Sequence, residues 1–333
     1  MYRHEPRTPE AFPERSAGAG PPWGVLACPC CRVRLSRTGE TASCPRCGAR
    51  YEGGRGRPLD LRPPRDLVAR AEFRVPPPSD GSVDRADAAV RRLSKCQRPD
   101  VDFANVPVPF HLDDILLSYF PQASGPDSLV LDLGCGTARH REVCEHAGFH
   151  YVGLDYDSPD ATVLGDAHAL PFDDGSFEFV LCVSVLEHVR FPFLAIAEAH
   201  RVLKPGGRLI GDVAFLESYH SHSFYHHSHL GIWNLLDYAG FEIDVIAPNP
   251  TWPALVAIAC DGLFPKMPRP LARALVSPVE SLHRAWWWAG AHLRDRTRVN
   301  EGIRVRNLSG SFSFIAHRPR TERAAPRSGA ADD

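Results

Sequence analysis

The sequence predicts an α/β fold in which a parallel sheet follows a small cysteine-rich module, and three observations lead to this prediction. Residues 129–133 are apolar and break into a glycine-rich turn, as a buried strand does where it feeds a helix. Further apolar strand candidates follow at 151–155 and 177–183. Ahead of the sheet, two pairs of cysteines with CxxC spacing stand within the first 50 residues.

Length and composition set the class of protein. The 333 residues exceed one ordinary domain, and 44% hydrophobic residues with a net charge of −2 indicate a globular, water-soluble protein. No apolar run of about 18 residues occurs, so the sequence predicts no membrane-spanning helix. The first residues lack the apolar stretch of a signal peptide, and we therefore expect a cytoplasmic protein.

The glycine-rich turn indicates which ligand the sheet binds. Gly134 and Gly136, on either side of Cys135, let the backbone turn tightly and approach a ligand at the carboxyl end of the strand. Arg139 stands where the dinucleotide fingerprint requires a small residue, and no Gly-Lys-Ser/Thr follows for a nucleotide-triphosphate loop. The carboxylate of Asp132 repels a pyrophosphate but suits a positively charged ligand such as S-adenosylmethionine.

A second acid and an ordered series of motifs extend this interpretation. Asp155 ends the next strand, 19 residues after Gly136, where a carboxylate can accept both ribose hydroxyls of an adenosine. Four further motifs follow in order, at 165–172, 176–181, 186–188 and 201–207. From about residue 128 to residue 245, this order resembles the class I S-adenosylmethionine-dependent methyltransferases of the type 11 kind. The resemblance implies a Rossmann-like sheet of seven strands.

The resemblance also implies a cofactor site. Its candidate residues are Asp132, Gly134, Cys135, Gly136, Asp155, Asp166 and Ala167. The glycines would approach the methionine part, and Asp132 would meet the ammonium group directly or through water. Asp155 would take the ribose. Asp166 would bond the adenine amino group, with Ala167 beside the ring.

One segment departs from the family's pattern. Only the ten residues 156–165 separate Asp155 from Asp166, where the family usually carries a whole helix. Ten residues that include a proline cannot hold a crossover helix and the next strand. We expect a loop there, which leaves one side of the adenosine pocket less covered.

Methyl transfer from a sulfonium needs mainly orientation, because the methyl group is already activated. A general base is needed only for a hydroxyl or a protonated amine. His188 is the nearest titratable candidate by position, and stabilising the turn after Glu187 is its alternative role. Tyr219 and His220 follow the strand expected at 208–213, where related methyltransferases have a substrate loop. They are candidates to face the acceptor, or they merely pack over the pocket.

Histidines are concentrated in that loop, where five of the chain's 16 fall between His220 and His229. Only His222 and His226 have the i, i+4 spacing of a helical zinc site. A metal bound by this cluster is therefore not the favoured interpretation.

The two CxxC pairs predict a structural zinc site. Its expected ligands are Cys28, Cys31, Cys44 and Cys47, with Cys30 as a spare thiol. Two disulfides are the alternative, which a reducing cytosol disfavours. The run through Tyr51 and Pro58 resembles the zinc-binding module of the Trm112-like proteins. A similar module precedes the catalytic domain of the large-subunit rRNA guanine methyltransferases.

The predicted organisation has seven parts: a disordered start (1–24), a zinc ribbon (25–61), a linker (62–100), a methyltransferase core (101–247), an insertion or lid (248–307), the last strand (308–318) and a disordered tail (319–333). We expect the linker to space the ribbon from the core. The insertion contains Trp286, Trp287 and Trp288, which could seat in a membrane interface, line a hydrophobic substrate tunnel, or pack over the sheet edge.

These patterns predict a methyltransferase that acts on a small-molecule oxygen, nitrogen or carbon, with a hydrophobic natural-product or lipid-like acceptor as one form. An rRNA or tRNA base methyltransferase is the first alternative, because residues 1–65 hold 12 arginines against 6 acids. A non-catalytic scaffold is the second, and the intact glycine turn argues against it. The sequence leaves the oligomeric state open.

Overall fold

The computed structural model describes most of the chain. The described residues are 20–54, 56–69, 71–73, 75, 77, 81, 84–85, 90, 99–293 and 301–321. Most of the segments expected to be disordered, at the start and in the tail, lie outside these residues. The sequence also predicts a short helix from residue 83 to residue 93, and most of it lies outside the described residues as well.

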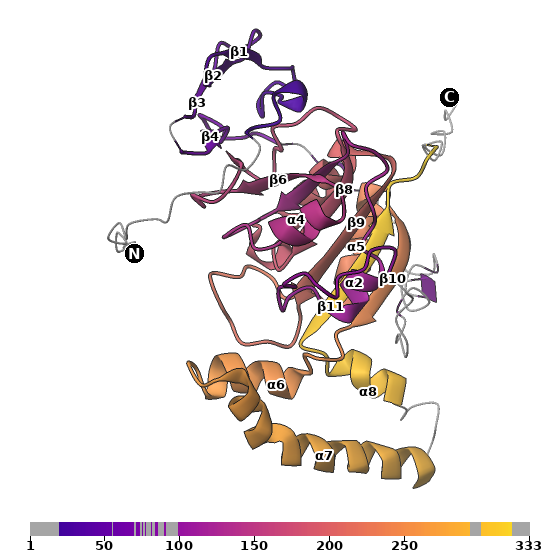
Figure 1. The fold of residues 1–333 in the computed structure, drawn as a ribbon. Helices are drawn as coiled ribbons and strands as arrows, with labels where there is room; N and C mark the ends of the chain where they lie inside the picture. The colour runs from indigo at the N-terminus through magenta and orange to yellow at the C-terminus, as the bar shows by residue number, and fades with distance from the viewer. Residues whose placement is uncertain are drawn as a thin grey trace, which may run out of the picture.

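A mixed sheet of eight strands forms the centre of the molecule, as the α/β prediction requires (Figure 1). Its order is β10-β11-β9-β8-β5-β6-β7-β4. The strands are β4 (Leu59–Asp60), β5 (Leu129–Leu133), β6 (His150–Asp155), β7 (Val163–Leu164), β8 (Phe177–Val183), β9 (Leu203–Ala214), β10 (Glu242–Pro248) and β11 (Ser311–His317). Strand β11 runs antiparallel to β9 and β10, while the pairs from β9 across to β4 are parallel. The expected seven strands are present, and β4 adds an eighth.

Helices connect these strands, with one exception that the sequence predicted. They are α2 (Asp114–Ser118), α3 (Arg141–His146), the 3-10 turn η2 (Leu186–His188), α4 (Pro192–Val202) and α5 (His229–Ala239). The Ser228 hydroxyl accepts the N–H of Gly231 at the start of α5, and Gly240 ends that helix at φ +86°. The fully described stretch from β6 to β7 contains no helix, so the predicted loop is confirmed.

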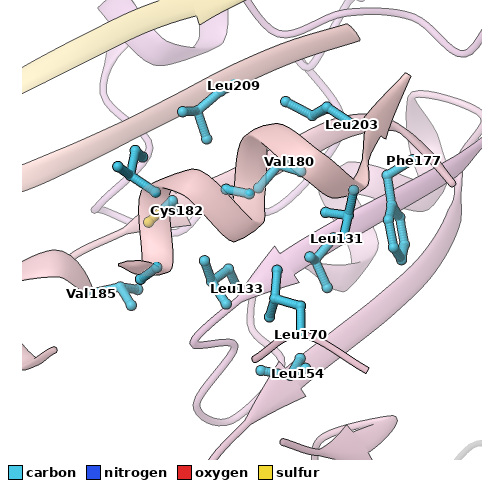
Figure 2. Packing of buried hydrophobic residues seen from close by; sticks show 14 of the residues in the cluster. Leu131, Leu133, Leu154, Leu170, Phe177, Val180, Cys182, Val185, Leu203 and Leu209 are labelled. Atoms are coloured by element: carbon cyan, nitrogen blue, oxygen red, sulfur yellow. The ribbon is translucent and has the colours of Figure 1, made fainter. Parts of the chain in front are cut away.

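Apolar side chains from neighbouring strands form the main core. Leu131 and Leu133 of β5 pack with Val180 and Cys182 of β8 and with Leu209 of β9, all fully buried (Figure 2). The buried face of α4 covers this cluster with alanines and an isoleucine. The core holds the carboxyl ends of β5, β6 and β8 in fixed positions, and open α/β sheets bind ligands there.

The N-terminal module is built into the edge of the sheet. It contains a small antiparallel sheet of β1 (Ser36–Thr38), β2 (Thr41–Ser43) and β3 (Arg50–Glu52), and its last strand, β4, pairs with β7. Leu26 and Leu61 are completely buried in the same cluster as Phe172. The expectation that a linker spaces the module from the core is therefore wrong, because the two parts share one interior.

Hydrogen bonds fix this docking at the segment that follows β7. The N–H of Ala27 donates to the Pro171 carbonyl at 2.9 Å, and the N–H of Asp173 donates to the Val25 carbonyl at 2.9 Å. The Arg32 guanidinium donates to the buried Glu198 carboxylate at 2.8 Å.

The insertion lies at the opposite end of the molecule from the N-terminal module (Figure 1). It consists of α6 (Ala254–Ile258), a π-helical turn η3 (Ala259–Leu263), the long α7 (Arg269–Leu293) and α8 (Glu301–Asn307). A separate small core, which includes Val256 and Val276, joins α6 to α7. Among the described residues, no helix has the length and apolarity needed to cross a bilayer.

Candidate cofactor and acceptor site

The glycine-rich loop after β5 has the conformation that its sequence predicts. Gly134 and Gly136 have φ values of +70° and +51°, which L side chains rarely adopt. A β-carbon on Gly134 would lie 2.6 Å from Cγ2 of Val185, so the two loops are in close contact. A β-carbon on Gly136 would meet no atom within 4 Å. The loop is therefore closely packed on one side and open on the other.

Asp132 lies beneath this loop. Its carboxylate is 1% exposed and accepts a hydrogen bond from the Tyr151 hydroxyl at 2.6 Å. Nδ1 of the buried His140 lies 3.2 Å from both carboxylate oxygens. Both carboxylate oxygens therefore have partners within the protein.

Asp155 holds the glycine loop from the neighbouring strand. Its Oδ2 accepts the N–H of Gly136 at 2.9 Å, and its Oδ1 accepts the N–H groups of Asp157 and Ser158, each at 3.2 Å. The side chain thus lies at the carboxyl end of β6, beside the open face of the loop. Cys135, by contrast, is buried, and burial raises the pKa of its thiol.

Asp166 and Ala167 follow β7. The N–H and Nδ1 of His168 bond to the Asp166 carboxylate, at 2.9 and 2.6 Å. Burial alone would raise the pKa of Asp166, but these bonds outweigh it and lower the pKa, so the group is a carboxylate at neutral pH. Ala167 packs against the main core. The short loop after β6 is covered by Arg62, whose guanidinium donates to the Tyr156 carbonyl at 3.3 Å.

A second group of polar side chains gathers beyond the end of β8. The structure brings His188 together with His220, 32 positions away in the sequence, and adds Glu187 to them. One ligand atom of each lies within 4.8 Å of the others. Tyr219, the remaining catalytic candidate, is 72% exposed.

Burial shifts the pKa values of two of these side chains, Glu187 and His188. Burial raises the pKa of Glu187 to about 7. Burial, followed by the neighbouring imidazoles of His220, His226 and His222, lowers the pKa of His188. Perturbed groups of this kind concentrate at functional sites. Sequence reasoning missed Glu187, although a carboxylate directly beside His188 after a buried strand was a usable signal.

Residues of the insertion contact the loop that follows β9. The indole N–H of Trp252 donates to the Glu217 carboxylate at 2.8 Å, and the guanidinium of Arg269 lies 5.0 Å from the Trp252 ring and 3.9 Å from that of Phe110. Glu217 in turn lies 3.9 Å from Nδ1 of His220. These contacts join the segment before α2, the loop after β9 and the insertion around one region.

The four cysteines expected to bind zinc come together in the N-terminal module. The sulfurs of Cys28, Cys31, Cys44 and Cys47 lie within 4.8 Å of one another, while Cys30 is not part of the group. The sulfurs of Cys28 and Cys47 are 3.8 Å apart. A tetrahedral ion with bonds of about 2.3 Å requires a separation of about 3.8 Å, so the donor set fits zinc.

The segment that carries the glycine loop is similar to known proteins. Residues 131–211 match the family model described as "Methyltransferase domain". A demethylmenaquinone methyltransferase of Renibacterium salmoninarum is 40% identical over 96 residues, which are 26% of this chain and 40% of that protein. The Homo sapiens protein named Probable tRNA methyltransferase 9B is 34% identical over 116 residues, 31% of this chain and 25% of that protein. The chain thus spans less than half the length of these relatives.

One solved structure gives a distant likeness. A chain of the complex between the Haloferax volcanii Trm112 methyltransferase activator and a methyltransferase is 20% identical, with a TM-score of 0.38. The match covers 61% of this chain and 86% of that one. Residues 131–211, which carry the glycine loop and Asp155 within the central sheet, therefore resemble a methyltransferase domain.

Proposed function

We propose that this chain transfers a methyl group from S-adenosylmethionine to a small-molecule acceptor. The observation that carries the proposal is the open face of the glycine loop within the segment that matches the methyltransferase model. A ligand can approach the backbone at Gly136, where no side chain intervenes, and the Asp155 carboxylate stands beside it. This arrangement fits a cationic adenosine-bearing cofactor.

Each predicted residue has a part in holding that cofactor. Gly134, Cys135 and Gly136 supply the loop backbone for the methionine portion, and Asp155 exchanges its bond to the loop for the ribose hydroxyls. Asp132 positions the loop from below through Tyr151 and His140. The free oxygen of Asp166 and the surface of Ala167 serve the adenine. The bound cofactor supplies an electrophilic methyl group, so the chain's task is to orient the acceptor and exclude water.

Binding of S-adenosylhomocysteine tests this proposal directly. In calorimetry, Asp155→Ala is expected to weaken binding about tenfold or more, because two charge-assisted hydrogen bonds to the ribose are lost. Asp157→Ala is the matched control, since that exposed neighbour contributes only its N–H to the Asp155 carboxylate. Equal binding by both variants, or no binding by the parent protein, would contradict the assignment.

We assign the acceptor side to the region around His188 and His220. The imidazole of His188, whose pKa is lowered by burial, can accept a proton from an acceptor hydroxyl. Tyr219 lies on the same loop at its exposed edge and is the outermost candidate. The relative from Renibacterium salmoninarum is named for a quinone acceptor, and this supports a hydrophobic ring compound as the substrate class.

We infer that the ribbon binds a structural zinc ion through its four cysteines. The 3.8 Å separation of two sulfurs fits a tetrahedral site, and the Tyr51 hydroxyl lies 3.3 Å from the Cys28 sulfur, where it can donate to a thiolate. A module of this size has too little core of its own to fold without such an ion.

A lipid surface is the proposed location of the acceptor, and α7 supports this. One face of the helix is apolar and at least half exposed along its length, through Leu271, Leu275, Val279, Leu282, Trp286 and Leu293. Helices of this composition lie in the headgroup region of a membrane.

Vesicle binding tests the role of α7. Leu282→Ser combined with Trp286→Ser is expected to lower cosedimentation with anionic phospholipid vesicles by tenfold or more, since each buried side chain contributes about 1.5 to 3 kcal/mol. Val68→Ser, which changes an exposed apolar residue elsewhere, should have no effect. If the parent protein ignores vesicles but dimerises through this face, the face contacts a second copy instead.

A nucleic-acid acceptor is the second candidate. It is supported by the relative named for tRNA methylation and by the arginine-rich first 65 residues. An RNA affinity that falls steeply with salt, and is lost with those residues, would favour this candidate over the first.

A further inference from the structure

We propose that Glu187, His188 and His220 form a second metal site, distinct from the cysteine cluster, which binds a divalent transition-metal ion. The proposal rests on a juxtaposition that the fold creates. Glu187 and His188 follow β8 in the turn η2, whereas His220 lies in the loop after β9. Strands β8 and β9 are adjacent and parallel, so their carboxyl ends bring the three side chains together.

The distances suit an ion. One ligand atom of each residue lies within 4.8 Å of the other two. Bonds of about 2.0 to 2.2 Å from a zinc-like ion to nitrogen and oxygen place neighbouring ligand atoms about 3 to 4 Å apart. Side-chain movements of less than about 1 Å would therefore close the site.

Two of the three ligands have buried atoms without partners among the described residues. Oε2 of Glu187 and Nδ1 of His188 make no hydrogen bond. Glu187 is only 1% exposed, so water does not reach it from the surface. A buried polar atom without a hydrogen-bond partner costs free energy. A cation bound between these atoms would remove that cost.

The third ligand is oriented by the backbone. Nδ1 of His220 lies 3.0 Å from the Ser218 carbonyl, so this nitrogen carries the proton and donates it there. The lone pair is then on Nε2. Histidine ligands of metals are commonly fixed by such a second hydrogen bond.

A further carboxylate lies beside these ligands. The Glu217 carboxylate lies 3.9 Å from Nδ1 of His220. Backbone strain also concentrates at the two loops, where the non-glycine residues Ser184, Ser221 and His222 have positive φ values. Strain of this kind collects at functional sites.

His226 lies close to His220 but is not expected to be a ligand. Its ring lies 5.9 Å from that of His220, but its Nδ1 bonds to the Phe215 carbonyl at 3.1 Å and its Nε2 to the Ser223 hydroxyl at 3.3 Å. With both nitrogens engaged, His226 has no free lone pair to offer and is not a ligand. It is a matched control for His220.

The donor set indicates the class of ion and its use. Two imidazoles and one carboxylate suit zinc, iron(II), cobalt or nickel rather than magnesium, and three protein ligands leave coordination positions open. In the proposed methyltransferase, those positions would take an acceptor oxygen. This use rests on the proposed function, but occupancy by a metal does not.

Metal content and S-adenosylhomocysteine binding are measured on the same samples. Full-length protein stripped with a chelator under reducing conditions is dialysed against zinc and analysed by mass spectrometry. Two ions per chain are expected in the parent and in His226→Ala, and one ion in Glu187→Gln and in His220→Ala. Cobalt(II) provides a second readout, because the ion lost in these two variants should lack the thiolate charge-transfer band of the cysteine site.

Folding is checked by thermal unfolding of the zinc-loaded variants. One ion in the parent, or two ions in His220→Ala, would overturn the proposal. A parent protein that holds two ions but does not bind S-adenosylhomocysteine would instead contradict the proposed function. The proposal of a second metal site would stand.

Discussion

Cys44→Ser is expected to abolish zinc binding at the ribbon and to lower the affinity for S-adenosylhomocysteine at the same time. Structural zinc contributes on the order of 10 kcal/mol to small modules, so residues 25–61 should lose their fold without it. Those residues bond to Pro171 and Asp173, which directly follow the segment proposed to hold the adenine. Zinc content, thermal unfolding and calorimetric affinity measure the effect, which should reach about tenfold in affinity.

Cys30→Ser is the control for this experiment. Cys30 lies beside the same turn but outside the four-sulfur group, so the variant should keep its zinc and its affinity. Zinc-free Cys44→Ser protein that binds S-adenosylhomocysteine as well as the parent would show that the module does not support the cofactor site.

Gly134→Ala should produce the largest loss of cofactor binding among single substitutions in the loop. The new β-carbon would lie 2.6 Å from Cγ2 of Val185, in a backbone conformation of φ +70° that alanine adopts at a cost of about 1 to 3 kcal/mol. The loop must then shift away from Val185 and from its hydrogen bond to the Leu154 carbonyl. Affinity for S-adenosylhomocysteine should fall by a hundredfold or more.

Two further variants separate the causes of that loss. Gly125→Ala introduces a β-carbon with no atom within 4 Å and should bind normally. Adding Val185→Ala to Gly134→Ala removes the steric clash and should restore part of the affinity, leaving the backbone cost. If Gly134→Ala alone binds as the parent does, the loop is not the cofactor site.

Sequence reasoning succeeded where the information was local. Apolar runs located β5, β6 and β8, because a buried parallel strand has that pattern wherever it occurs. The proline and the shortness of 156–165 correctly predicted that no helix connects β6 to β7. The CxxC spacing brought four sulfurs together because two short turns require little else.

Features that depend on distant partners could not be read from the chain. The two-residue strand β4 has no periodicity of its own and exists through its pairing with β7. The hydrogen bond from Arg32 to Glu198 joins residues 166 positions apart, and the sequence around neither residue indicates it. The meeting of Glu187 and His188 with His220 likewise depends on the adjacency of two strands. The helical spacing of apolar residues in α7 was sufficient to predict its apolar face, but the sequence prediction relied on the three consecutive tryptophans.

The common interior of ribbon and sheet limits how this protein can be shortened. Leu26 and Leu61 fill space that Val163, Leu170 and Phe172 would otherwise expose to water. A fragment that starts after residue 61 would present that surface beside a bare strand edge, and such edges promote aggregation. Truncation for expression or crystallisation is therefore better directed at the far end of the molecule, where α7 stands on a small core of its own.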